Sequence, residues 1–214
     1  MGVFFRSRRY CIAALLLGAV LGLSHAQTTA QRTVLVLGDS LSAEYGLARG
    51  TGWVTLLEQR LAKEKPGTRV VNASISGETT FGGRSRLAAL LAQHKPTHVI
   101  LELGGNDALR GLSLDATRAN LEWMTQQSKK AGARVLLLGM QMPPNYGADY
   151  AKRFEGLYAQ VARAEKVGLV PFFLKGVADG ADPTRLFQPD RIHPTTEAQP
   201  LMLDNVWPEL KKIL

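Results

Sequence analysis

Residues 33–42 read TVLVLGDSLS, an apolar run that ends in glycine, aspartate and serine. A short, uninterrupted run of this kind is typical of a strand buried on both faces of a parallel sheet. Ser40 would then stand at the end of the strand, where a helical turn begins and where its own N–H points at whatever its hydroxyl attacks. A serine at the start of a helix is also a common N-cap, so this stretch alone leaves both interpretations of Ser40 open.

Short apolar runs alternate with longer helical patterns along the rest of the chain. Pro171 predicts that the last strand lies at an edge or an end of the sheet, and Pro200 and Pro208 predict a kink or interruption in the last helix. The alternation predicts an α/β fold, a three-layer α/β/α sandwich with a mostly parallel five-stranded sheet, in which ligands bind beyond the carboxyl ends of the strands. The expected strands are 33–38, 69–73, 98–103, 134–139 and 169–173, and the expected helices are 52–64, 82–94, 115–131, 149–166 and 195–214.

The N-terminal residues 1–26 have the composition of a secretory signal peptide. Three arginines precede an apolar run over 12–23, which is shorter than the about 20 residues that cross a bilayer as a helix, and small residues follow up to Ala26. We therefore expect cleavage near Ala26 and Gln27, a single domain over 27–214, and a periplasmic or secreted protein. An uncleaved membrane anchor is the alternative.

Cysteine content and charge exclude several classes of function. Cys11 is the only cysteine and lies in the expected signal peptide, so the remaining chain has no cysteine nucleophile, thiolate metal site or disulfide. The formal net charge is +8, but the basic residues are scattered and no aromatic residues interleave with them. This pattern indicates a solvated surface and no nucleic-acid partner, and it allows at most a transient contact with anionic lipid headgroups.

Asp190 and His193, near the C-terminus, could activate a serine. A serine hydroxyl is a weak nucleophile that needs an adjacent base, and a neutral histidine can remove its proton near pH 7. A carboxylate three residues before the histidine can fold back on a turn and orient the imidazole. The other histidines beyond the signal peptide, His94 and His98, are expected to have structural roles at a helix C-terminus and at a half-exposed strand end.

Two further motifs directly follow expected strands and could supply an oxyanion hole. GGND at 104–107 would point the Asn106 amide into the crevice, and SISGET at 74–79 would offer the Gly77 N–H there. With the Ser40 N–H these make three donors, and a donor of this kind is worth roughly 10²–10³ in rate. The alternative is that both motifs are ordinary turns, with Gly77 accommodating a positive φ angle.

Together these blocks resemble the SGNH (GDSL) hydrolase superfamily, whose fold is flavodoxin-like. Its four marker residues are serine, glycine, asparagine and histidine, and Ser40, Gly77, Asn106 and His193 occupy those positions in the family's order. Asp190 occupies the position of the triad acid. The resemblance implies the catalytic residues Ser40, Asp190 and His193, and an oxyanion hole formed by Ser40, Gly77 and Asn106.

The likeness narrows to the bacterial exported thioesterase I/protease I/lysophospholipase (arylesterase) subfamily, and covers essentially all of 27–214. It implies a compact monomeric domain with broad esterase activity, no cofactor and no metal. Glu44 departs from the subfamily, in which we expect glycine at that position, and this leaves its effect near the nucleophile open. The motifs that carry the likeness are GDSLSA (38–43), VNASISG (71–77), ELGGND (102–107), LRG (109–111), PxNYG (143–147), IHP (192–194) and AQP (198–200).

The resemblance also implies a shallow acyl groove between the loops 108–113 and 142–147. Its apolar walls would include Leu109, Leu112, Met142 and Tyr146, whose alternative role is ordinary core packing under a loop.

The function expected is that of a serine hydrolase that cleaves acyl esters and thioesters of small molecules or lipids through an acyl-enzyme intermediate. Two alternatives remain open: an O-acetylesterase of cell-surface glycans, and a lipid-binding carrier that keeps the fold without turnover.

Overall fold

The computed structural model describes residues 1–3, 32–142 and 146–214. Residues 4–26 of the expected signal peptide, its cleavage site and Cys11 lie outside the described residues. So do residues 143–145 of the PxNYG motif.

A five-stranded sheet forms the centre of the domain, and every neighbouring pair of strands is parallel. The strand order is β2-β1-β3-β4-β5, so the chain winds outward in both directions from β1 and β3. Loops after β1 and β3 therefore open a crevice at the point where the winding direction reverses. The strands are β1 (Arg32–Gly38), β2 (Thr68–Asn72), β3 (His98–Glu102), β4 (Arg134–Leu138) and β5 (Gly168–Val170).

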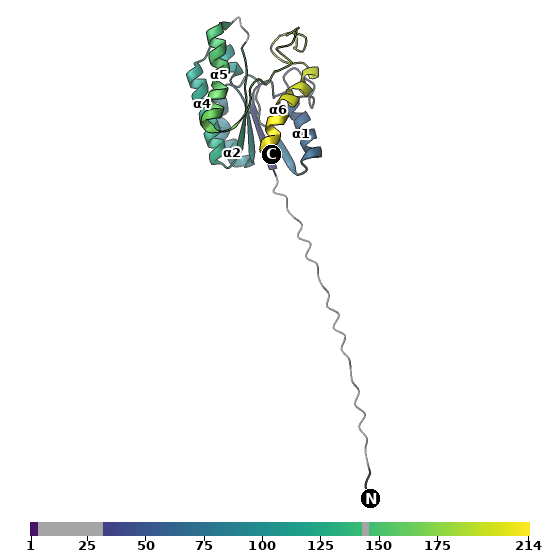
Figure 1. The fold of residues 1–214 in the computed structure, drawn as a ribbon. Helices are drawn as coiled ribbons and strands as arrows, with labels where there is room; N and C mark the ends of the chain where they lie inside the picture. The colour runs from purple at the N-terminus through teal and green to yellow at the C-terminus, as the bar shows by residue number, and fades with distance from the viewer. Residues whose placement is uncertain (4–31, 143–145) are drawn as a thin grey trace.

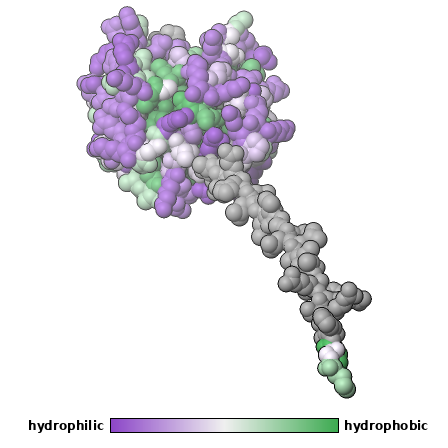
Figure 2. All heavy atoms as spheres, turned by 60° about the horizontal axis from the view of Figure 1, so that its bottom comes forward, coloured by the Kyte–Doolittle hydropathy of each residue, from purple (hydrophilic) through white to green (hydrophobic). Residues whose placement is uncertain are grey.

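Helices cover both faces of the sheet, which confirms the predicted three-layer α/β fold (Figure 1). On one face lie α1 (Trp53–Glu64) and α6 (Gln199–Ile213), and on the other lie α2 (Thr80–His94), α4 (Leu114–Lys130) and α5 (Ala148–Glu165). The side chains of Val34 to Leu37 in β1 have no exposed surface, as expected for a strand packed on both faces. Figure 2 shows mostly hydrophilic side chains over the face it presents. Among the described residues, no helix is long and apolar enough to span a membrane.

Three elements differ from the sequence-based expectation. The fifth strand is short and stops at Val170, directly before Pro171, and it lies at the sheet edge as that proline predicts. A one-turn helix, α3 (Gly105–Leu109), forms where the GGND motif suggested only a turn. The sequence predicted a kink or an interruption of the last helix at its prolines, and the interruption is wrong. Pro200 lies in the first turn of α6, where its missing N–H has no intrahelical partner, and α6 continues through the exposed Pro208.

Candidate active site

Ser40 stands on a tight turn directly after β1. The carbonyl of Asp39 accepts hydrogen bonds from the N–H groups of Ser42 (3.2 Å) and Ala43 (3.0 Å), and the Asp39 carboxylate accepts one from the N–H of Leu41 (3.0 Å). These bonds start a helical turn at the strand end, and they leave the half-buried Ser40 facing the crevice.

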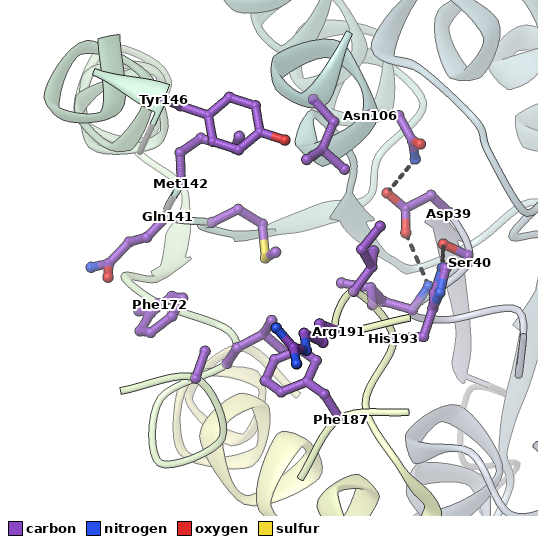
Figure 3. Close-up of a pocket in the computed structure, with 17 residues that line it drawn as sticks. Asp39, Ser40, Asn106, Gln141, Met142, Tyr146, Phe172, Phe187, Arg191 and His193 are labelled. Carbon is purple, nitrogen blue, oxygen red and sulfur yellow. Dashed lines mark hydrogen bonds between the residues drawn. The ribbon is translucent and has the colours of Figure 1, made fainter. Parts of the chain in front are cut away.

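The structure brings His193 and Asp190 to Ser40, across 153 residues of sequence. His193 Nδ1 lies 2.7 Å from Asp190 Oδ2. On its other side, His193 Nε2 lies 2.9 Å from Ser40 Oγ (Figure 3). Because the carboxylate accepts a hydrogen bond from Nδ1–H, Nε2 carries no proton and can accept the proton of the serine hydroxyl. The geometry is that of a nucleophile, a base and an orienting acid.

A turn over residues 188–193 holds the acid and the base together. Asp190 Oδ1 accepts hydrogen bonds from the N–H groups of Ile192 (2.9 Å) and His193 (3.0 Å), and the Gln188 carbonyl accepts one from Arg191 N–H (2.9 Å). Partial desolvation raises the pKa of Asp190, but the hydrogen bonds from His193 and Ile192 outweigh it and lower that pKa to about 2. Asp190 is therefore ionised throughout the ordinary range of pH.

Tyr45 and Gln188 support the imidazole from outside. The ring centroids of Tyr45 and His193 lie 4.3 Å apart with the planes tilted by 37°. Gln188 Nε2 donates to the carbonyls of Tyr45 (2.9 Å) and Pro194 (3.1 Å), which ties the serine loop to the histidine loop.

Asn106 reaches the site from α3, which follows β3. Gly104 opens this helix with a φ of 118°, and a side chain there would collide with the hydroxyl of Tyr158. Glycine therefore lets α3 pack close to α5. Asn106 Nδ2 donates to Asp39 Oδ2 at 2.9 Å, which orients the amide beside Ser40 and leaves its second proton available.

Asp107 anchors α3 from behind. Its buried carboxylate accepts hydrogen bonds from the N–H (2.8 Å) and hydroxyl (2.5 Å) of Thr80 in α2, and from the hydroxyl of Thr117 (3.2 Å) in α4. The short helix that carries Asn106 is thus fixed to two long ones.

Gly77 lies on the loop after β2 with a φ of 78°, in the left-handed region that favours glycine. Its carbonyl accepts a hydrogen bond from Arg110 Nη2 at 3.0 Å. Of the three residues expected to form an oxyanion hole, Ser40 and Asn106 line the pocket described below, whereas Gly77 is not among the residues that line it.

Two buried carboxyl groups lie directly behind the nucleophile. Glu102, at the end of β3, accepts hydrogen bonds from the N–H of Asp39 (3.2 Å) and from the hydroxyl of Ser42 (2.7 Å), and Trp53 Nε1 donates to the same hydroxyl (3.2 Å). Burial raises the pKa of Asp39 to about 6, and burial together with the nearby Asp39 raises the pKa of Glu102 well above its usual range. Burial therefore makes both carboxyl groups hold a proton more tightly than exposed carboxyl groups do, and the charge of Asp39 adds to this effect at Glu102.

A pocket of about 370 Å³ opens from the serine and histidine toward Gln141 and Phe172 (Figure 3). Leu109, Met142 and Tyr146 line it, as the sequence predicted for a groove. The expectation for Leu112 is wrong, because its side chain is 42% exposed and does not line the pocket. The sequence did not identify the other apolar lining residues, which are Leu41, Met140, Phe172, Leu174, Ala178, Phe187 and Ile192.

The other two histidines lie away from this site. His94 is the last residue of α2. His98 is buried rather than half-exposed, because its ring nitrogens lie 2.9 Å from Thr97 Oγ1 and 2.7 Å from the carbonyl of Ile213. In the described part of the chain, no group of three or more histidine, cysteine, aspartate or glutamate side chains is placed to hold a metal ion.

Comparison with known proteins decides the family. Residues 36–200 match the model of the GDSL-like Lipase/Acylhydrolase family. The chain belongs to this family. Membership confirms the predicted superfamily, and with it the predicted class of enzyme, a hydrolase of carboxylic esters.

The names of similar proteins agree with the assignment of this GDSL hydrolase to a family of ester hydrolases. It is 51% identical to "Esterase TesA" of Pseudomonas aeruginosa over 202 residues, which cover 94% of this chain and 99% of the relative. It is 40% identical to "Thioesterase 1/protease 1/lysophospholipase L1" of Escherichia coli K12 over 188 residues, or 88% of each chain.

The solved structures of family members support the fold directly. A crystal structure of TesA, 53% identical, superposes with a TM-score of 0.82 over 86% of this chain and 100% of that one. The esterase EstA from Pseudoalteromonas sp., 42% identical and inhibited by monoethylphosphonate, gives a TM-score of 0.78 over 85% of this chain and 97% of its own.

Glu44, the departure from the GDSL subfamily, turns away from the pocket. Its carboxylate accepts hydrogen bonds from Gly50 N–H (2.9 Å), Gly52 N–H (2.8 Å) and Thr55 Oγ1 (3.0 Å). Its φ of 59° explains why glycine is expected at this position. Glu44 adopts a strained backbone conformation, and the hydrogen bonds to its carboxylate hold together the loop that leads into α1.

Proposed function

We propose that this GDSL hydrolase cleaves acyl esters and thioesters with Ser40 as nucleophile, His193 as general base and acid, and Asp190 as the orienting carboxylate. The observation that supports this most strongly is the unbroken chain of hydrogen bonds from Asp190 Oδ2 through the imidazole to Ser40 Oγ.

The first half of the reaction transfers the acyl group to the enzyme. Ser40 Oγ attacks the acyl carbonyl carbon as His193 Nε2 takes the hydroxyl proton. The tetrahedral intermediate then collapses, the bond from the acyl carbon to the leaving oxygen or sulfur breaks, and His193 protonates the departing alcohol or thiol. Water attacks the acyl-enzyme by the same route and releases the acid.

Negative charge develops on the carbonyl oxygen in both steps. The Ser40 N–H, the Gly77 N–H and the free Nδ2 proton of Asn106 are the donors we assign to this oxyanion. Asp39 acts as a positioning residue here, because it holds the Asn106 amide through the 2.9 Å hydrogen bond.

The substrate's acyl chain lies, in this proposal, along the apolar pocket past Leu109, Met142 and Tyr146. A cavity of about 370 Å³ is in the usual range for small-molecule sites and larger than an acetyl group needs. This favours acyl chains of several carbons over acetyl esters of glycans. The names of the relatives, which include esterase, arylesterase, thioesterase and lysophospholipase, are consistent with that substrate class.

We further propose that the protein acts as a monomer in the periplasm or outside the cell, after loss of residues 1–26. The composition of those residues supports export.

Hydrolysis of 4-nitrophenyl esters with two to sixteen carbons tests the proposal, with residues 27–214 as enzyme and Ser40→Ala as control. Loss of hydrolysis in Ser40→Ala, with a preference for chains longer than acetate, is the expected result. Exclusive cleavage of the acetate would favour an O-acetylesterase. A folded wild-type protein that turns over no ester would favour a lipid carrier and overturn the proposal.

A further inference from the structure

The pocket wall carries one charged side chain that the proposed mechanism does not use. Of the 17 described residues that line the pocket, Asp39, Arg191 and His193 are charged or titratable near neutral pH, and the first and last belong to the catalytic arrangement. In Figure 3 the Arg191 side chain lies on the side of the pocket where Phe187 is found. Arginine in a largely apolar wall calls for an explanation.

Arg191 occupies a backbone position that glycine would fill more easily. Its φ of 58° is in the left-handed region, which costs a residue with a Cβ conformational energy. The turn that holds Asp190 against His193 requires this conformation, because the Arg191 N–H donates to the Gln188 carbonyl there. The side chain therefore projects from the same turn as the base, one residue from the acid.

The guanidinium of Arg191 makes no hydrogen bond or ion pair with any residue that the structure describes. Arg110, on the neighbouring loop, is different, because it donates to the Gly77 carbonyl at 3.0 Å. Arg86, near the same end of the sheet, pairs with Glu78 at 2.6 Å. A guanidinium presents a planar array of donors that matches a carboxylate or phosphate, and it stays charged at all relevant pH values.

We propose that Arg191 is a specificity-determining residue that binds an anionic group, carboxylate or phosphate, carried by the ester substrate. This inference rests on the proposed function and extends it to acidic esters. A carboxylate at the far end of the acyl chain and a phosphate on the alcohol present the same chemistry to the guanidinium. Arg191 is exposed and lines the same pocket as Phe187 and Ile192, so its guanidinium can reach an anionic group on a substrate bound there.

Two matched pairs of esters test this. The acyl-side pair is 4-nitrophenyl hexanoate and mono-4-nitrophenyl adipate, which differ by a terminal carboxylate. The alcohol-side pair is 1-octanoylglycerol and 1-octanoylglycerol 3-phosphate. We compare kcat/KM in the wild type, Arg191→Gln and Arg191→Lys, with Arg153→Gln on α5 as a variant that removes the same charge from a different exposed position.

The expected result is that Arg191→Gln lowers the ratio of anionic to neutral kcat/KM about fivefold in at least one pair, while the neutral esters change less than about twofold. Arg191→Lys should restore part of the ratio, Arg153→Gln should leave it unchanged, and the ratio should fall with added salt. The pair that responds identifies which side of the ester carries the anion.

Equal effects on both members of each pair, or none on either, would overturn the inference while hydrolysis of the neutral esters left the proposed function standing. A wild type that cleaves none of the four esters would overturn both.

Discussion

Replacing Asp39 by asparagine should change the pH dependence of stability. Compared with the wild type, the variant should gain stability as the pH rises from acid to neutral, and it should be less active. Asp39 is only 3% exposed, and burial raises its pKa from 3.8 to about 6. A change of this size corresponds to about 3 kcal/mol of lost stability once the group is ionised. The native state holds the proton between about pH 4 and pH 6 and the unfolded chain does not, so this group's contribution to the free energy of unfolding falls as pH rises through that range.

The asparagine side chain of the Asp39→Asn variant cannot ionise, and this part of the pH dependence disappears. The carboxamide has one acceptor oxygen where the carboxylate had two, so either Leu41 N–H or Asn106 Nδ2 loses its partner at a cost of about 1–3 kcal/mol at every pH. We therefore expect Asp39→Asn to be the less stable protein at pH 4, and to gain about 3 kcal/mol relative to the wild type by pH 7.5.

Urea denaturation of both proteins at pH 4 and pH 7.5 measures the effect, and Asp115→Asn is the matched control because its carboxylate is 79% exposed. A wild-type-to-variant difference that is the same at both pH values would refute the assignment of a buried charge to Asp39. Hydrolysis of 4-nitrophenyl hexanoate should fall in the same variant through kcat, since a carboxamide with one acceptor oxygen replaces the carboxylate that orients Asn106.

Three further predictions concern single side chains. Asn106→Ala should lower kcat by about 10²–10³ with little change in KM, and wild-type kinetics would remove the amide from the oxyanion hole. Asp190→Asn should retain more activity than Ser40→Ala, measured on the same ester, because the nucleophile and base remain; the reverse order would contradict the assigned roles. Glu44→Ala should have a free energy of unfolding about 1–2 kcal/mol lower than that of Glu44→Gly, measured by urea denaturation. Both variants lose the carboxylate's hydrogen bonds, but only alanine keeps the strain of the left-handed backbone. Both should keep the ester chain-length preference of the wild type, and a changed preference would place Glu44 at the substrate.

The parts of the site that lie at strand ends could be predicted from the sequence. Ser40 and Asn106 each come after an apolar run, and parallel strands bring the residues after their carboxyl ends to one edge of the sheet. The pairing of Asp190 with His193 was predictable for a similar reason, because three residues are enough for a turn to bring the side chains together.

The buried carboxyl pair, the wall of the pocket and the short helix α3 were not found from the sequence. The sequence did contain a signal for Glu102, because a buried glutamate at the end of an apolar strand needs hydrogen-bond partners. Those partners, Ser42 and Asp39, lie 60 and 63 residues away in the sequence, so the local pattern could not identify them. The pocket residues Phe172 and Phe187 come from irregular segments, and local periodicity says nothing about which face such residues cover. Leu112 was misplaced for the same reason.

The separation of 153 residues between Ser40 and His193 also determines when the protein can first hydrolyse esters. A nucleophile near the start of the domain has no base until the C-terminal end of the chain has folded back against it. A chain that is still being synthesised therefore carries a serine no more reactive than any other. Ester hydrolysis therefore requires that the whole domain has folded. The activity can be used to detect variants that fail to complete folding.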